Sequence, residues 1–132
     1  MKSAQDLYQF AQTHQIHFNA KEKKGVSLFE KFLTASPTIN YTFSFIGFHK
    51  YESFKNHEGL TAYAISGNTL YAVSQRNHYT YNLYHCQKIT GQKRINGIKL
   101  TLAFPKEIFK IDLGFADGDL VVAALEQSRK NS

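Results

Sequence analysis

The feature that most constrains the fold is an apolar/polar alternation along residues 60–84, LTAYAISGNTLYAVSQRNHYTYNLY. Successive side chains of a β-strand point to opposite faces, so a period of two predicts strands rather than helices. Two short polar pairs, Gly67-Asn68 and Arg76-Asn77, interrupt the alternation, and each suits a tight turn between antiparallel strands. The stretch therefore predicts three consecutive strands joined by two hairpins.

The same period occurs on both sides of this stretch. We expect four further strands, over residues 39–47, 85–94, 98–104 and 107–113. Asn96-Gly97 is a strong hairpin signal, because both residue types tolerate a positive φ. Gly91 lies in the middle of its strand, and we interpret it as a bulge or bend.

Helical spacing replaces the period of two at the N-terminal end of the chain. Residues 1–16 predict an amphipathic helix with Leu7 on its buried face, and residues 19–25 predict a polar, basic connector that ends in glycine. A second short helix should begin with Ser27 as its N-cap and end at the Ser36-Pro37 pair, because a residue before proline avoids helical geometry.

A final amphipathic helix is expected over residues 116–130. Seven strands joined mostly by tight turns should curl into a barrel or two packed sheets, so that few edges stay exposed, and the last helix should cover one open end. We therefore predict an α+β fold, with an N-terminal helix and basic connector (1–24) and a seven-stranded antiparallel barrel or sandwich domain (25–132).

Composition limits the functional classes. The chain has 132 residues and a single cysteine, Cys86, so no intrachain disulfide can form and a reducing compartment is expected. The N-terminal stretch lacks the apolar core of a signal peptide, and we expect a cytoplasmic location. Sixteen basic and ten acidic residues give a net charge of +6, which favours anionic partners.

Seven strands followed by one helix is the element order of the pleckstrin homology (PH) superfold. Residues 43–73 (FSFIGFHKYESFKNHEGLTAYAISGNTLYAV) and 88–104 (KITGQKRINGIKLTLAF) resemble the bacterial PH-like domains. The resemblance covers roughly residues 27–130 and implies a non-enzymatic module, without naming a ligand.

The sequence departs from that family at one turn. Ser66-Gly67-Asn68-Thr69 stands where the family has a Thr-Asn-Lys-Arg type of turn, so the family's basic pair is absent. The paired basic residues of phosphoinositide-binding PH domains are also not matched, since Lys50 and Lys55 lie inside a loop. The resemblance therefore does not support phosphoinositide binding.

Residues 48–59 form the first candidate site, a loop longer than the 2–5 residues of a tight hairpin. It mixes cationic and aromatic side chains as contact surfaces do, and we take the following as its candidate binding residues: His49, Lys50, Tyr51, Phe54, Lys55 and His57. The alternative is that Tyr51 and Phe54 only cover the end of the barrel.

A second candidate is a basic patch made of Lys88, Lys93, Arg94 and Lys99.

We expect a protein partner or self-association, with Tyr8, Phe10 and Phe18 as exposed aromatic residues for docking on the barrel or on a second copy. The alternative is an anionic ligand, either nucleic acid or an acidic membrane surface, bound through the basic charge.

The residues give little support for base stacking, metal binding or catalysis. The tyrosines of residues 60–84 could stack bases, but aromatic residues are also what antiparallel strands prefer, and we interpret them as structural. His14 and His17 have helical spacing without a third ligand, and His85 and Cys86 should point to opposite faces of a strand. We therefore expect Cys86 to be a small buried residue, and we expect no metal, no cofactor and no enzymatic activity.

Overall fold

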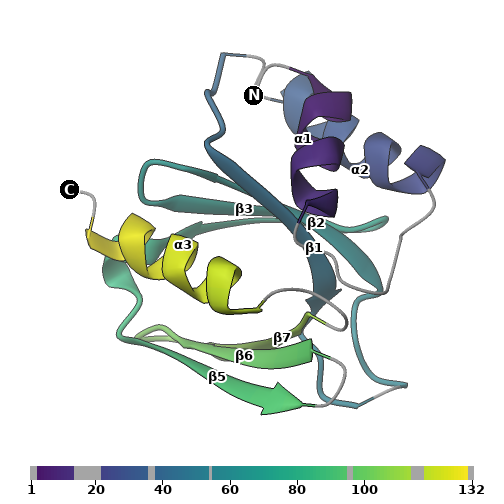
Figure 1. Ribbon diagram of the computed structural model, residues 1–132. Helices are drawn as coiled ribbons and strands as arrows, with labels where there is room; N and C mark the ends of the chain where they lie inside the picture. The colour runs from purple at the N-terminus through teal and green to yellow at the C-terminus, as the bar shows by residue number, and fades with distance from the viewer. Residues whose placement is uncertain are drawn as a thin grey trace.

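The computed structural model describes residues 3–13, 22–35, 38–53, 55–94, 97–113 and 118–130. In these residues the elements follow one another as shown in Figure 1: α1 (Ala4–Gln12), α2 (Glu22–Ala35), β1 (Phe43–His49), β2 (Leu60–Ser66), β3 (Thr69–Val73), β4 (His78–Asn82), the 3₁₀ helix η1 (Leu83–His85), β5 (Lys88–Arg94), β6 (Gly97–Ala103), β7 (Ile108–Asp112) and α3 (Gly118–Lys130). The predicted α+β class is confirmed.

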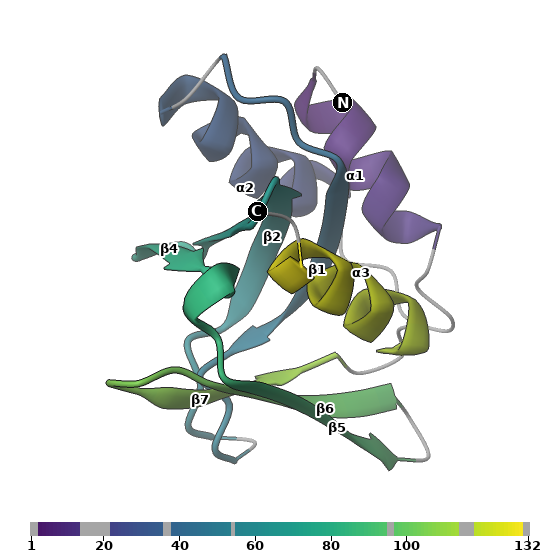
Figure 2. The same ribbon diagram turned by 90° about the vertical axis from the view of Figure 1, so that its left-hand side faces the viewer.

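The strands form one antiparallel sheet in the order β4-β3-β2-β1-β7-β6-β5. β1 pairs with β2 from Phe43 to Phe48 but with β7 only at Phe48 and His49. The sheet therefore consists of two halves, β1–β4 and β5–β7, joined at the end of β1 (Figure 2). The predicted closure into a barrel is not observed, because no ladder joins β4 to β5 in the described residues.

Two hydrophobic cores lie on opposite faces of the first half. The inner core lies between the two halves and α3, with Phe45, Leu70, Leu100 and Leu125 among its buried members. The outer core lies between β1–β3 and the helix pair α1 and α2, which cover that half in Figure 1. β1 and β2 are consequently buried on both faces, and Ser44 donates a buried hydrogen bond to the Leu7 carbonyl at 2.6 Å.

The N-terminal helices differ from the sequence prediction in their bounds and their exposure. α2 begins at Glu22, so part of the predicted connector is helical and Ser27 is not the N-cap. Tyr8 is buried rather than exposed, and Phe10 is half-buried with its ring 5.1 Å from that of Phe43. Phe18 and the last residues of the predicted first helix lie outside the described residues.

Gly25 is inside α2 because the ring of Tyr8 packs against its backbone. A Cβ atom at this position would lie 2.5 Å from Tyr8 Cε1, closer than van der Waals contact allows. Glycine here permits α1 and α2 to approach each other, and it does not end a helix. The glycine and the polar residues before it are typical of a connector in the sequence, and the contact with Tyr8 explains the glycine within a helix.

We expect Gly25→Ala to lower the free energy of unfolding by about 1–3 kcal/mol, because of overpacking against Tyr8. Helix propensity alone predicts the opposite sign, a gain of about 1 kcal/mol. Urea unfolding of Gly25→Ala, Tyr8→Ala and the double variant measures the coupling. A stabilising Gly25→Ala change, or additive effects in the double variant, would contradict the packing explanation.

Within the sheet, the hairpin at Gly67-Asn68 is confirmed, and Gly67 has φ +60°. The β3–β4 hairpin is also present, but its turn residues are Gln75 and Arg76, because the Ser74 N–H donates to the Asn77 carbonyl and so closes the turn one residue earlier than predicted. The expected bulge at Gly91 is wrong, because Gly91 pairs regularly with Leu100. Its small size instead makes room for Ile98, whose Cδ1 would lie 2.6 Å from a Cβ at this position. The strand predicted over 78–84 ends at Asn82, where its side chain caps η1 by accepting a hydrogen bond from the Tyr84 N–H.

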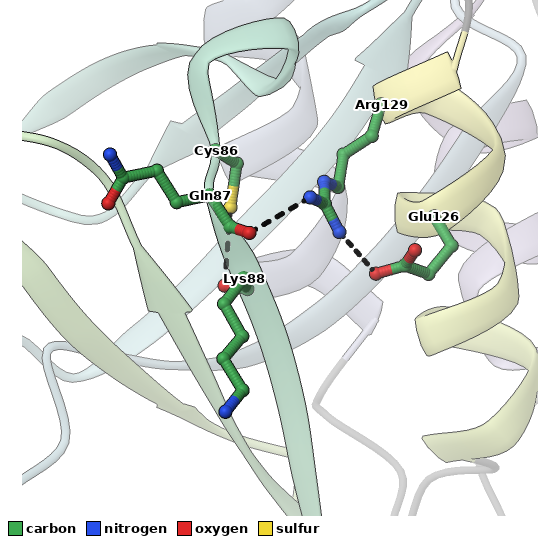
Figure 3. A network of polar contacts seen from close by, with 5 residues as sticks. All are labelled: Cys86, Gln87, Lys88, Glu126 and Arg129. Carbon is green, nitrogen blue, oxygen red and sulfur yellow. Dashed lines mark hydrogen bonds and ion pairs between the residues drawn. The ribbon is translucent and has the colours of Figure 1, made fainter.

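α3 lies between the two halves of the sheet (Figures 1 and 2). Its first residue, Gly118, touches the side chain of Ile98 of β6, and near its end Ser128 donates to the Gly67 carbonyl at 2.6 Å. Arg129 binds both Glu126 and the Gln87 carbonyl, as Figure 3 shows. The helix is therefore held to both halves.

Cys86 lies beside Arg129 and its partners and is buried, as expected from the sequence. Its thiol donates to the Lys88 carbonyl at 3.4 Å, and burial raises the pKa of the thiol.

Among the described residues, no helix has the length and apolar character needed to cross a bilayer.

Candidate functional site

A polar triad of His49, Tyr63 and Tyr81 lies inside the inner core, below the loop that joins β1 to β2. His49 is the last residue of β1 and is 0% exposed. Its Nδ1 lies 2.9 Å from the Tyr63 hydroxyl and its Nε2 lies 2.7 Å from the Tyr81 hydroxyl. The structure thus places this candidate loop residue in the core, where it cannot contact a partner directly.

All three groups of the triad are neutral. Burial, reinforced by the neighbouring Lys50 charge, lowers the pKa of His49 to about 3. Burial raises the pKa of both Tyr63 and Tyr81 well above its usual range. A neutral imidazole has one donor and one acceptor nitrogen, so one tyrosine donates to His49 and the other accepts from it. The triad satisfies its polar atoms internally and holds three strands together.

The far end of the loop is fixed to β4 through Glu58. This carboxylate accepts from the Tyr79 hydroxyl at 2.5 Å and from Asn77 Nδ2 at 3.2 Å. Burial, together with the Glu58 contact, raises the pKa of Tyr79 to about 12. The Glu58 N–H also donates to the His49 carbonyl at 2.9 Å, so both ends of the loop are anchored to one place.

Lys50 begins the loop in an unusual backbone conformation. Its φ of +51° lies in the left-handed region, which lysine rarely occupies. Its Nζ lies 4.5 Å from the centroid of the Tyr79 ring, within the range of a cation–π contact. The loop therefore holds a positive charge at a defined position, at the cost of backbone strain.

The next residue, Tyr51, connects the loop to the second half of the sheet. Its N–H donates to the Lys110 carbonyl at 2.9 Å, and its ring stacks on His57 with centroids 5.5 Å apart. Lys99 of β6 places its Nζ 5.1 Å from the centroid of the Tyr51 ring. Two further candidate residues, His57 from the same loop and Lys99 from β6, thus meet around Tyr51.

A hollow of about 320 Å³ opens at this end of the molecule, and we call it the loop-end hollow. It is lined by Lys50, Tyr51, Glu52, Phe109 and Lys110. Phe109 forms part of its wall and also packs on His49, with ring centroids 4.9 Å apart. The hollow therefore combines two cationic side chains, two aromatic rings and one carboxylate.

A second hollow, of about 430 Å³, lies on the other side of the loop beside the β3–β4 turn. Its lining is polar: His57, Glu58, Gly59, Gln75, Arg76 and Asn77. His57 Nδ1 accepts a hydrogen bond from the Gly59 N–H at 2.9 Å. This hollow lacks the paired lysines of the first.

The predicted loop residues occupy different positions in the structure. Lys50 and Tyr51 line the loop-end hollow, His57 supports Tyr51, and Lys55 is exposed. Phe54 lies outside the described residues. Sequence reasoning missed Phe109 and Lys110, because only the pairing of β1 with β7 brings them to the loop, and nothing local in the sequence indicates that pairing.

The predicted basic patch is divided between two faces of β5–β6. Lys99 lies opposite Gln92, so the pleat places Lys88 and Lys99 on one face and Lys93 on the other. Lys93 forms an ion pair with Asp119 at 3.1 Å, and both side chains are exposed. The side chain of Arg94 lies outside what the structure describes.

The tyrosines of residues 60–84 are mostly part of the two cores, as the structural interpretation expects. Tyr63 and Tyr81 belong to the triad, and Tyr79 is half-buried beside them. Tyr71 points to the opposite face and packs edge-on against Tyr41, with centroids 5.6 Å apart. Tyr84, at 62% exposed, is the exception.

The described residues contain no group of three histidine, cysteine or acidic side chains placed to hold a metal ion. His14 and His17 lie outside those residues.

Searches with protein-family models and among curated proteins found no match to this chain.

Proposed function

We propose that this chain is a non-enzymatic, PH-like binding module that recognises an acidic segment of a partner protein in the loop-end hollow. The observation that carries the proposal is Lys50, which is held in a left-handed conformation beside the hollow. The PH-like identity is supported by the order of seven strands and a C-terminal helix, together with the resemblance of residues 43–73 and 88–104.

Strain at Lys50 argues for recognition rather than for stability. A non-glycine residue in a sparsely populated region costs about 1–3 kcal/mol, and such residues concentrate in ligand clamps and active sites. Here the cost is borne by a lysine whose charge lies over the Tyr79 ring instead of extending freely into water. A glycine or asparagine would close the loop with less strain, so the lysine side chain is the feature that needs explaining.

The chemistry of the hollow suits an acidic peptide segment. Lys50 and Lys110 offer two ammonium groups, Tyr51 offers ring surface, and the buried Phe109 contributes to the wall. Glu52 is the opposing charge, so an isolated phosphate or sulfate gains less than a segment whose carboxylates and apolar groups are spaced apart. The net charge of +6 would also increase the rate of encounter with an acidic partner.

The alternative function, binding of nucleic acid or an acidic lipid surface, draws on one different observation. Lys88, Lys99 and Lys110 share the outer face of β5–β7 by the pleat of the ladder. Asp112 lies directly opposite Lys99 on the same face and weakens its potential. We therefore give this function second place.

Titration of a fluorescent peptide of alternating glutamate and tyrosine, followed by anisotropy, tests the proposal. Replacing Lys50 and Lys110 together by methionine should weaken binding by about tenfold or more, because both charges are lost from the hollow. Methionine keeps a side chain over Tyr79, so the melting temperature should change little. The matched control replaces Lys88 and Lys106, two exposed lysines outside the hollow, in the same way.

Three outcomes would count against the proposal. Absence of peptide binding at low salt would remove it, since electrostatic attraction is strongest there. Equal losses in both double variants would point to net charge rather than the hollow. Tighter binding of single-stranded DNA or phosphatidylserine vesicles than of the peptide would favour the alternative.

A further inference from the structure

The outer edge of β4 is unpaired by any strand that the structure describes. β4 stands at one end of the strand order and is bonded to β3, and Figure 2 shows it at the side of the molecule. The Ser74 N–H donates to the Asn77 carbonyl and the Leu83 N–H to the Asn68 carbonyl. Bonded pairs alternate along an antiparallel ladder, so Tyr79 and Tyr81 are bonded to β3. The N–H groups of His78, Thr80 and Asn82 therefore point to the outer edge.

The two edges of the sheet carry different residues. β5, the other edge, has the sequence KITGQKR, with three basic residues and a glycine that discourage pairing with a second strand of the same kind. β4 has the sequence HYTYN, without lysine, arginine, acid, proline or glycine. Tyrosine and threonine are strong strand formers, so β4 lacks the usual protection of an edge strand.

β4 is also held rigidly in its extended form. The Tyr81 hydroxyl is bonded to His49 and the Tyr79 hydroxyl to Glu58, so both inward side chains are fixed from inside. The outward-facing side chains of His78, Thr80 and Asn82 are exposed. A strand that is already ordered loses little further conformational entropy when another strand pairs with it.

We infer that two copies of this chain associate by antiparallel pairing of their β4 edges about a two-fold axis at Thr80. In this register Thr80 lies opposite Thr80 of the other copy, and His78 lies opposite Asn82. The outward N–H groups of both strands then find carbonyl acceptors across the axis, and the two threonines form a favourable cross-strand pair.

A second copy fits the β4 edge because pairing there brings little charge repulsion. Each chain carries +6, so two copies repel each other over most of their surfaces, whereas β4 brings no lysine, arginine or acidic residue to the axis. Two-fold pairing of one edge with itself is a closed arrangement and stops at a dimer. The inference concerns the outward edge of β4 and does not rest on the loop-end hollow.

Sedimentation velocity over a concentration series tests the inference on the whole chain. The wild type should approach twice the 15.1 kDa mass of one chain as concentration rises. Thr80→Lys should weaken the dimer by about tenfold or more, because it places two like charges side by side at the axis. Thr90→Lys is the matched control, since Thr90 is an exposed threonine whose N–H faces β6 on the protected edge.

Thr80→Pro provides a second variant that removes the outward N–H and leaves the β3 ladder intact, as proline is tolerated on edge strands. It should also yield a monomer. In the wild type, hydrogen exchange at His78, Thr80 and Asn82 should slow as concentration rises. A monomer at all concentrations, a dimer that survives both Thr80 changes, equal weakening by Thr90→Lys, or growth beyond a dimer would each overturn the inference.

Discussion

Replacing His49 by alanine should lower the free energy of unfolding by about 3–5 kcal/mol, the largest effect that we expect from any single change. The change leaves the Tyr63 and Tyr81 hydroxyls in the core without their shared partner and opens a cavity between the surrounding rings. Unsatisfied buried polar groups and a cavity each add to the cost. Urea unfolding followed by far-UV circular dichroism measures it.

A triple variant separates the lost hydrogen bonds from the lost packing. His49→Leu with Tyr63→Phe and Tyr81→Phe removes all three polar groups and nearly preserves the volume, so it should be much closer to the wild type than His49→Ala. If the triple variant were less stable than His49→Ala, or if His49→Ala cost under about 1 kcal/mol, the triad would not have the structural role that its geometry indicates.

Acid should destabilise the wild type by about 3 kcal/mol between pH 7 and pH 4 through His49 alone. The folded-state pKa of His49 is about 3, below the ordinary value of 6.5. The unfolded chain therefore binds a proton that the folded protein excludes, and the contribution of neutral His49 to stability is complete above pH 6.5. It decreases as pH falls, by about 1.4 kcal/mol per unit, until His49 itself protonates near pH 3.

Urea midpoints at one-unit steps from pH 7 to pH 4 test this dependence, with the triple variant as the control. The variant keeps every other titrating group, so the difference between the two curves isolates the triad. Parallel curves would mean that His49 is protonated in the folded protein and that its burial has been misjudged. A steeper fall for the triple variant would contradict the sign.

The strands and their hairpins could be predicted from sequence because their signals are local. The alternation in residues 60–84 and the turn residues Gly67-Asn68 act within a few positions of each other, and the structure has β2, β3 and β4 there. The C-terminal helix is predicted by the same kind of signal, and it begins within two residues of the expected start. Periodicity and turn chemistry are short-range properties, so they can be recognised in the sequence without knowledge of the fold.

The errors occur where a distant residue decides the local structure. Gly25 resembles the end of a connector until Tyr8 is placed against it, and Gly91 resembles a bulge until Ile98 fills the space above it. His49 follows the alternation of β1 inward, although the polar stretch of residues 48–59 predicts a loop that includes it. In each case the deciding partner lies between 7 and 32 residues away in the sequence.

The residues of the candidate site were also only partly predictable from the sequence. Lys50 and Tyr51 could be chosen from sequence, because a loop of twelve residues between two strands needs a reason for its length. Lys110 and Phe109 could not, since they join the loop only through the short pairing of β1 with β7. The sequence by itself thus determined the class of fold, the hairpins and the existence of a candidate loop, all of which depend on neighbouring residues. The tertiary structure alone decided that His49 is a buried partner of two tyrosines, that the basic patch is divided, and that β4 is the edge without charge, because contacts between distant segments have no local pattern.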